Sequence, residues 1–164
     1  MKVAVFLHGT TMMHWSAVGR PQEERVQQVQ RGEASVRDFA PYVPIGAAAN
    51  KLRTWSKQGA DLIYLSSHKR PEDVELDQVV LTTYDFPAGQ VVFRSPGESY
   101  QDMAWRVSPD VLIEDDCESI GGEQEMIFPH LRPDIQGRII SIVIKEFEGI
   151  DHLPDDFVAL KSSR

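Results

Sequence analysis

Five short apolar runs recur along the chain, and each is followed by a polar or glycine-containing segment. Uninterrupted apolar runs of this length are typical of strands that are buried on both faces, as in a parallel sheet. We therefore expect strands near residues 3–7, 61–65, 91–93, 110–113 and 139–144.

The segments between these runs have the spacing and the end signals of helices. Apolar residues recur at helical intervals from Ile45 to Trp55, and Gly59 is a suitable C-terminal stop. Pro71, followed by two acidic residues, predicts the start of a second helix. Residues 99–107 are expected to form a third. Strands that alternate with helices specify a parallel sheet with right-handed crossovers.

The fold class predicted for residues 1–164 is therefore a single α/β domain, a Rossmann-like three-layer sandwich with a mainly parallel central sheet. Residues 12–40 are more polar and include a probable helix between Pro21 and Gly32, so we expect them to form a small insert or cap after the first strand. Residues 155–164 have little apolar content and are expected to be a tail.

Charge and cysteine content narrow the classes of function. The net charge is −8, and no cluster of Lys and Arg interrupts it, so neither nucleic acid nor an anionic membrane is an expected partner. Cys117 is the only cysteine, and the first apolar run is too short for a signal sequence or a membrane span. These features predict a cytoplasmic protein.

In open α/β sheets, ligands bind at the carboxyl ends of the strands. The segments HGTT, SSHK and EDDCESIGG follow three of the predicted strands at residues 8–11, 66–69 and 114–122. We expect His8, Ser66 and Asp116 to approach one another at this edge of the sheet.

The same three segments, in this order, resemble the motifs of the haloacid-dehalogenase superfamily. That family's first motif, Asp-x-Asp-Gly-Thr, corresponds to Phe6-Leu7-His8-Gly9-Thr10, where both aspartates are replaced. Its second motif, a strand that ends in Thr or Ser, corresponds to LIYLSS with Ser66. Its paired acids correspond to Asp115 and Asp116 in VLIEDD, and Arg94 is the best-placed cation for its third motif.

The resemblance implies an anion and Mg²⁺ pocket with altered chemistry. Phe6 stands at the position of the nucleophilic aspartate and has no lone pair to attack phosphorus, so no aspartyl-phosphate forms. His8 takes the position of the general acid and base. Asp115 and Asp116 would hold Mg²⁺ weakly, because one carboxylate is lost. The anion-binding residues implied for a small phosphorylated or anionic ligand are Thr10, Ser66 and Arg94.

Each of these side chains also has a structural interpretation. His8 could simply be hydrogen-bonded at a strand end, and Ser66 could cap the helix that begins near Pro71. Asp115 and Asp116 could likewise cap a helix. Arg94 could pair with Glu98, and a buried structural thiol is the commoner role for Cys117.

Three functional hypotheses follow. The first is a binding or regulatory protein that keeps an anion and cation pocket without aspartyl-phosphate chemistry. The second is a metal-assisted hydrolase in which His8 is the general base and Asp115 and Asp116 hold the cation. The third is a non-catalytic interaction module with a vestigial crevice.

Overall fold

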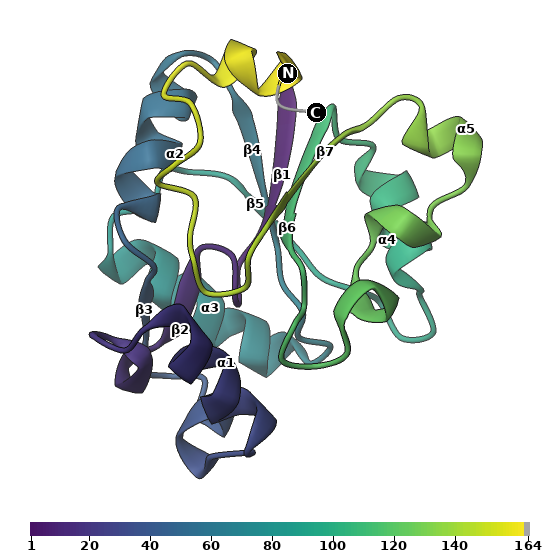
Figure 1. Cartoon of the computed structure of the whole chain (residues 1–164). Coiled ribbons are helices and arrows are strands. Elements are labelled where there is room, and N and C mark those ends of the chain that lie inside the picture. Colours follow the sequence, from purple (N-terminus) through teal and green to yellow (C-terminus); the bar gives the residue numbers. More distant parts are fainter. Residues whose placement is uncertain (163–164) are drawn as a thin grey trace.

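The computed structural model describes residues 1–162 around a five-stranded sheet in the order β5-β4-β1-β6-β7 (Figure 1). All adjacent strands of this sheet are parallel. The strands are β1 (Lys2–Phe6), β4 (Asp61–Leu65), β5 (Gln90–Val92), β6 (Val111–Asp115) and β7 (Ile140–Ile144). The five strands predicted from the apolar runs are confirmed, and their bounds differ by at most two residues.

Helices cover both faces of the sheet, which confirms the three-layer arrangement. Alternate residues of β1 enter two separate cores: Val3 and Val5 face one, and Ala4 and Phe6 face the other. The first core is completed by α2 (Ala48–Lys57), α3 (Pro71–Thr83) and the 3-10 helix η5 (Phe157–Ser162). The second is completed by α4 (Tyr100–Val107), the 3-10 helix η4 (Phe128–His130) and α5 (Pro133–Gln136).

The helices begin where the sequence signals predict. Pro71 is the first residue of α3, with Glu72 and Asp73 in its first turn. Ser99 and Asp102 form a reciprocal capping box at the start of α4. The longest helix, α3, has 13 residues, and within residues 1–162 no helix combines the length and the apolarity needed to cross a bilayer.

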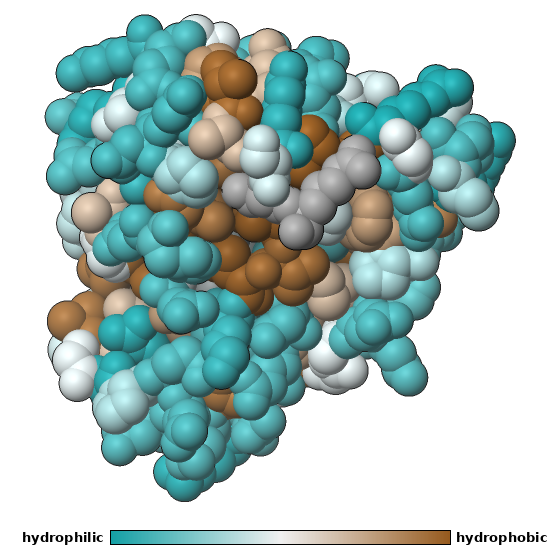
Figure 2. Space-filling model, turned by 45° about the horizontal axis from the view of Figure 1, so that its top comes forward, coloured by the Kyte–Doolittle hydropathy of each residue, from teal (hydrophilic) through white to brown (hydrophobic). Residues whose placement is uncertain are grey.

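The polar segment after β1 forms a small subdomain beside the sheet. It contains β2 (Met12–His14), the 3-10 helices η1 (Trp15–Ala17) and η2 (Ala34–Arg37), α1 (Gln22–Gln30) and β3 (Tyr42–Pro44). Because β2 pairs antiparallel with β3, this insert extends beyond the predicted bound at residue 40. Hydrophilic side chains cover most of its surface (Figure 2), and Val26 of α1 is buried within it.

The expectation of a tail after Pro154 is wrong for most of that segment. Phe157 and Leu160 are buried in the same core as α2. Two apolar residues at helical spacing are enough to attach a short 3-10 helix to the sheet layer, even where the overall apolar content is low. Residues 163–164 of the predicted tail lie outside the described residues.

The register of the strands brings their carboxyl ends to one edge. Phe6 lies opposite Leu65, and Asp115 lies opposite Ile144. The loops that follow β1, β4, β6 and β7 therefore leave the sheet at the same level. The insert lies at this end of the molecule, and the N-terminus lies at the other (Figure 1).

Candidate functional site

A pocket of about 320 Å³ opens at this edge, between the sheet and the insert. One wall carries His8, Asp115 and Glu146, which belong to the loops and strand ends of the sheet. The insert contributes another wall of the pocket, which includes His14 and Arg25. The pocket has the size and position expected of a small-molecule site in an α/β fold.

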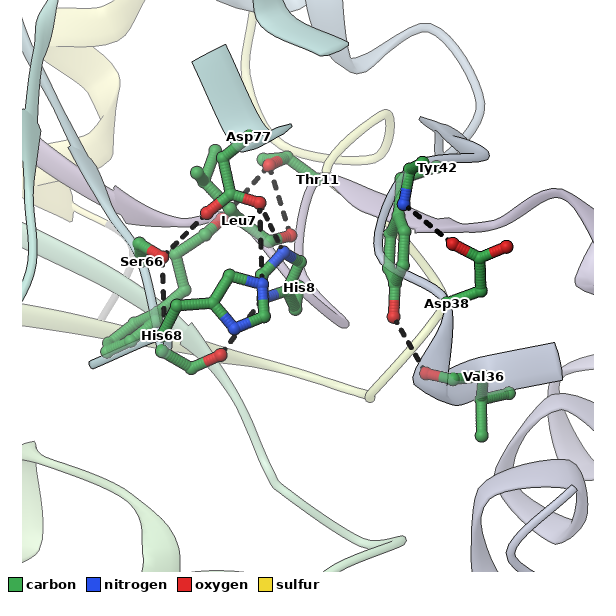
Figure 3. Close-up of polar contacts among 12 residues, drawn as sticks. Leu7, His8, Thr11, Val36, Asp38, Tyr42, Ser66, His68 and Asp77 are labelled. Atoms are coloured by element: carbon green, nitrogen blue, oxygen red, sulfur yellow. Dashed lines mark hydrogen bonds and ion pairs between the residues drawn. The ribbon is translucent and has the colours of Figure 1, made fainter. Parts of the chain in front are cut away.

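His8 is the centre of a hydrogen-bond network on this wall (Figure 3). Its Nε2 lies 2.7 Å from Asp77 Oδ1, and its Nδ1 lies 2.9 Å from Ser67 Oγ. An ionised Asp77 can only accept hydrogen bonds, so the proton of a neutral His8 is on Nε2. Nδ1 then accepts from Ser67, which leaves the His8 ring oriented as a general base.

Asp77 comes from the buried face of α3, where Val74 and Val80 are its apolar neighbours at helical spacing. Its second oxygen accepts a hydrogen bond of 2.6 Å from Ser66 Oγ. Nothing in the three loop motifs pointed to this residue. The sequence feature that could have identified Asp77 is its position among the apolar residues that recur at helical spacing in α3. A carboxylate buried in this way requires polar partners.

His68 lies against the same carboxylate. Its Nε2 is 3.7 Å from Asp77 Oδ1, and this buried nitrogen has no hydrogen-bond partner within residues 1–162. Burial, and secondarily the nearby His8, lowers the pKa of His68. Ligand atoms of His8, His68 and Asp77 lie within 4.8 Å of one another, so these three side chains could hold a transition metal.

A second group of ligand atoms, from Asp115, Asp116 and Glu146, also lies within 4.8 Å. Burial raises the pKa of Asp115. Burial, with the neighbouring carboxylates as a smaller cause, raises the pKa of Glu146 to about 7. An all-oxygen set of this kind suits a hard cation such as Mg²⁺ or Ca²⁺. Glu146, two residues beyond β7, was not predicted as a site residue.

These carboxylates are held by neighbouring donors. Asp115 accepts from the Thr10 hydroxyl at 2.7 Å and from the backbone N–H of Cys117 at 3.0 Å. Asp116 Oδ1 accepts from the backbone N–H groups of Glu118 and Glu146, so Asp116 stabilises a turn and does not cap a helix. Its other oxygen is the one that could face a cation.

The three predicted anion-binding residues do not present their polar groups to the pocket. Thr10 and Ser66 are fully buried, and their hydroxyls donate to Asp115 and Asp77. Arg94 does not line the pocket, because its guanidinium lies 3.8 Å from the centroid of the Tyr100 ring. Thr10 and Ser66 therefore orient carboxylates, and Arg94 takes part in a cation–π contact.

Phe6 and Cys117 both line the pocket, and neither is suited to act as a nucleophile there. The Phe6 ring packs edge-on against Tyr100, with 6.1 Å between the ring centroids. Burial, and then Asp115 and Glu146, raises the pKa of Cys117 above the usual thiol range. The thiol is therefore protonated at neutral pH and unreactive.

No family model matches the chain, and no curated protein matches it. Among solved structures, it is similar to a chain of the Pnkp1/Rnl/Hen1 RNA repair complex, with a TM-score of 0.50 and 13% identity, over 88% of this chain and 43% of the other. The chain thus spans less than half the length of that neighbour. A universal stress protein in complex with cAMP gives a TM-score of 0.35 and 12% identity, over 89% and 95% of the two chains. At such identities, similarity concerns the fold alone.

Proposed function

We propose that the chain is a divergent member of the haloacid-dehalogenase superfamily that binds a divalent cation and, through it, a small phosphorylated or anionic ligand. The observation that carries this proposal is the convergence of Asp115, Asp116 and Glu146 on the pocket edge. Mg²⁺ is the cation that such hard oxygen ligands favour.

The raised pKa of Glu146 supports a cation at this position. Burial, and to a smaller extent repulsion by Asp115 and Asp116, makes Glu146 take up a proton more readily than an ordinary glutamate in the free protein. A divalent cation would replace that proton and favour the ionised form of all three groups. An anion alone would be repelled, so its binding should depend on the cation.

The proposal excludes an aspartyl-phosphate intermediate. Phe6, at the position of the family's nucleophile, packs against Tyr100 and has no oxygen to attack phosphorus. We further propose a cytoplasmic location without nucleic-acid partners. The single cysteine and the net charge of −8 support these two points.

A second candidate function, hydrolysis of a bound ester or phosphate, is favoured by one observation. The 2.7 Å contact of His8 Nε2 with buried Asp77 leaves Nδ1 as an acceptor. Because Nδ1 already accepts from the Ser67 hydroxyl, the proton of the attacking water would pass to the Ser67 oxygen while the Ser67 proton passes to His8 Nδ1. The cation would stabilise the developing negative charge.

Calorimetric titration of MgCl₂ and inorganic phosphate, separately and together, tests the proposal. Each ligand should bind more tightly in the presence of the other. Asp116→Asn should abolish this coupling, because Asn keeps the oxygen that accepts from the backbone and replaces the other one. The matched control, Asp61→Asn, changes an exposed residue at the first position of β4, and Cys117→Ser should also leave the coupling nearly unchanged. Independent binding, or none at millimolar concentration, would support the hypothesis of a vestigial crevice.

A further inference from the structure

The wall of the pocket that the insert contributes contains a histidine with a fixed proton position. His14 is the last residue of β2 and is buried. Its Nδ1 accepts a hydrogen bond of 3.1 Å from the backbone N–H of Ser16. A backbone N–H can only donate, so this nitrogen carries the lone pair, and the proton of a neutral His14 is on Nε2.

That Nε2–H group is a donor without an acceptor in the described part of the chain. Nε2 of His14 is buried and has no hydrogen-bond partner within residues 1–162, and His14 lines the pocket. Burial lowers the pKa of His14, which favours the neutral ring with its Nε2–H. A buried donor that lacks an acceptor costs about 1–3 kcal/mol. An oxygen of a ligand would recover this once a small shift of the ring presents Nε2 to the pocket.

Arg25, on α1, brings a positive charge to the same wall. Backbone carbonyls hold its guanidinium: Nε donates to Ala17 and Arg20, and Nη1 donates to Phe147 at 2.7 Å. Within residues 1–162, no carboxylate lies within 4.0 Å of this guanidinium. Its charge is thus oriented but not neutralised, and burial lowers its pKa. A guanidinium in this state is a good partner for phosphate or carboxylate.

The insert is fixed relative to the acidic edge by two contacts of α1. Arg25 donates to the carbonyl of Phe147, and Gln22 donates to the carbonyl of Glu146 at 2.9 Å. The Arg25 guanidinium and the carboxylates of Asp115 and Glu146 therefore line one pocket, which carries charges of both signs. A ligand that contacts both kinds of group has an oxyanion for Arg25 and can reach a cation held by the carboxylates.

We propose that His14 Nε2–H and the Arg25 guanidinium form the oxyanion anchor of this pocket and bind a phosphate or carboxylate group of the ligand. The inference rests on the proposed function for the cation at Asp115, Asp116 and Glu146, but the anchor consists of different residues. The ligand is then a small molecule with a phosphate or carboxylate group, and residues of the insert bind that group. Thr10, Ser66 and Arg94, from which anion binding was expected, do not line the pocket.

Two variants remove the anchor with little change elsewhere. His14→Asn places an amide oxygen near the position of Nδ1, so the Ser16 N–H keeps its acceptor while the Nε2 donor is lost. Arg25→Gln removes the charge. The control Arg31→Gln makes the same change of charge at an exposed position at the end of the same helix.

The experiment is calorimetric titration of inorganic phosphate, and separately of malonate, into each full-length protein with saturating MgCl₂. Whichever oxyanion binds the wild type should bind His14→Asn and Arg25→Gln at least ten-fold more weakly, and Arg31→Gln within two-fold. The Mg²⁺ affinity measured alone should be unchanged in all three variants. In ¹⁵N NMR spectra of the wild type, the His14 ring should show the Nε2–H tautomer, and its Nε2 signal should shift as the oxyanion is added.

The outcomes separate the anchor from the cation site. Wild-type affinity in both folded variants, or no binding of either oxyanion to the wild type, would overturn the anchor. Oxyanion binding that needs His14 and Arg25 but not Mg²⁺ would support the anchor and contradict the proposed function. Arg25→Gln could fail to fold, because it leaves three backbone carbonyls without their donor. In that case, His14→Asn and the NMR titration still decide whether the oxyanion binds at the anchor.

Discussion

The hydroxyl of Thr10 donates to Asp115 Oδ2 across 2.7 Å, although 105 residues separate the two in the chain. Both residues are buried, and the contact joins the loop after β1 to the end of β6. It favours the ionised form of Asp115 against the effect of burial. Thr10 therefore holds the carboxylate in the orientation and the charge state that a cation requires.

Replacing Thr10 with valine should weaken both the fold and the cation site. Valine has nearly the same shape but cannot donate, so we expect the free energy of unfolding to fall by about 1–2 kcal/mol. The pKa of Asp115 should rise further, and the Mg²⁺ affinity near pH 7 should fall. Urea unfolding and calorimetry measure these effects. Thr10→Ser, which keeps the hydroxyl, should behave more like the wild type, and equal behaviour of the two variants would contradict this role.

Glu146 should make the stability of the metal-free protein depend on pH. Its pKa is raised from 4.5 to about 7 in the folded state, so the folded state binds the proton more tightly than the unfolded state does. The stabilising effect of this proton is complete below about pH 4.5 and is lost as the pH rises through 7. Glu146→Gln should therefore stabilise the metal-free protein above pH 7, on the order of 2–3 kcal/mol.

Thermal unfolding from pH 5 to pH 8.5 in EDTA measures this difference, and Glu148→Gln, at an exposed position two residues away, is the control. Saturating Mg²⁺ should reverse the order at pH 8, because the cation stabilises the ionised form of Glu146. If Glu146→Gln raises the unfolding temperature equally at pH 5 and pH 8, the stabilisation does not come from the protonation of Glu146.

Among the acidic residues of α3, Asp77 should be the one whose substitution destabilises the fold most. Asp77→Asn replaces one accepting oxygen with a donor group, which faces either the His8 Nε2–H or the Ser66 hydroxyl. We expect a loss of about 1–3 kcal/mol in the free energy of unfolding. Denaturant titration measures it, and Glu75→Gln, at an exposed position of the same helix, should change stability by less than about 0.5 kcal/mol.

Hydrolysis of aryl phosphates with Mg²⁺ should be absent or very weak in the wild type. Phe6→Asp should not restore full activity, because in the proposed alignment with the haloacid-dehalogenase motif His8 still stands at the position of the second aspartate. The same change places a carboxylate against Tyr100 in the core, so it should also destabilise the fold. Release of p-nitrophenol from p-nitrophenyl phosphate is the measurement. Vigorous Mg²⁺-dependent turnover by the pure wild type would contradict the assigned role of Phe6.

The sheet was predictable because each strand is a short apolar run that ends in polar residues. Both faces of β1, β4 and β6 are buried, so the runs have almost no polar interruption and their limits are sharp. The chain order of strands and helices then restricts the topology. β2 and β3 have three residues each and form a separate two-stranded sheet, so no comparable pattern marked them.

The side-chain directions in the site could not be predicted in the same way. Ser66 and Ser67 are adjacent at the end of β4, but Ser66 is buried against Asp77 and the exposed Ser67 contacts His8. Adjacent residues of an extended segment point in opposite directions, so an error of one residue exchanges the two roles. Asp77 and Arg25 come from helices whose packing places Asp77 against His8 and Arg25 in the pocket lining. That packing is a property of the tertiary structure.

The position of β1 in the middle of the sheet has a consequence for how the protein folds during synthesis. Val3 pairs with Leu62 and with Val111, so β1 is synthesised well before its second neighbour, β6. At roughly 5–20 residues per second, one hydrogen-bonding edge of β1 stays unpaired for several seconds until β6 emerges. Pairing between strands so far apart in the chain predicts slow folding. The pocket, which needs β1 between β4 and β6, forms only after β6 has been synthesised.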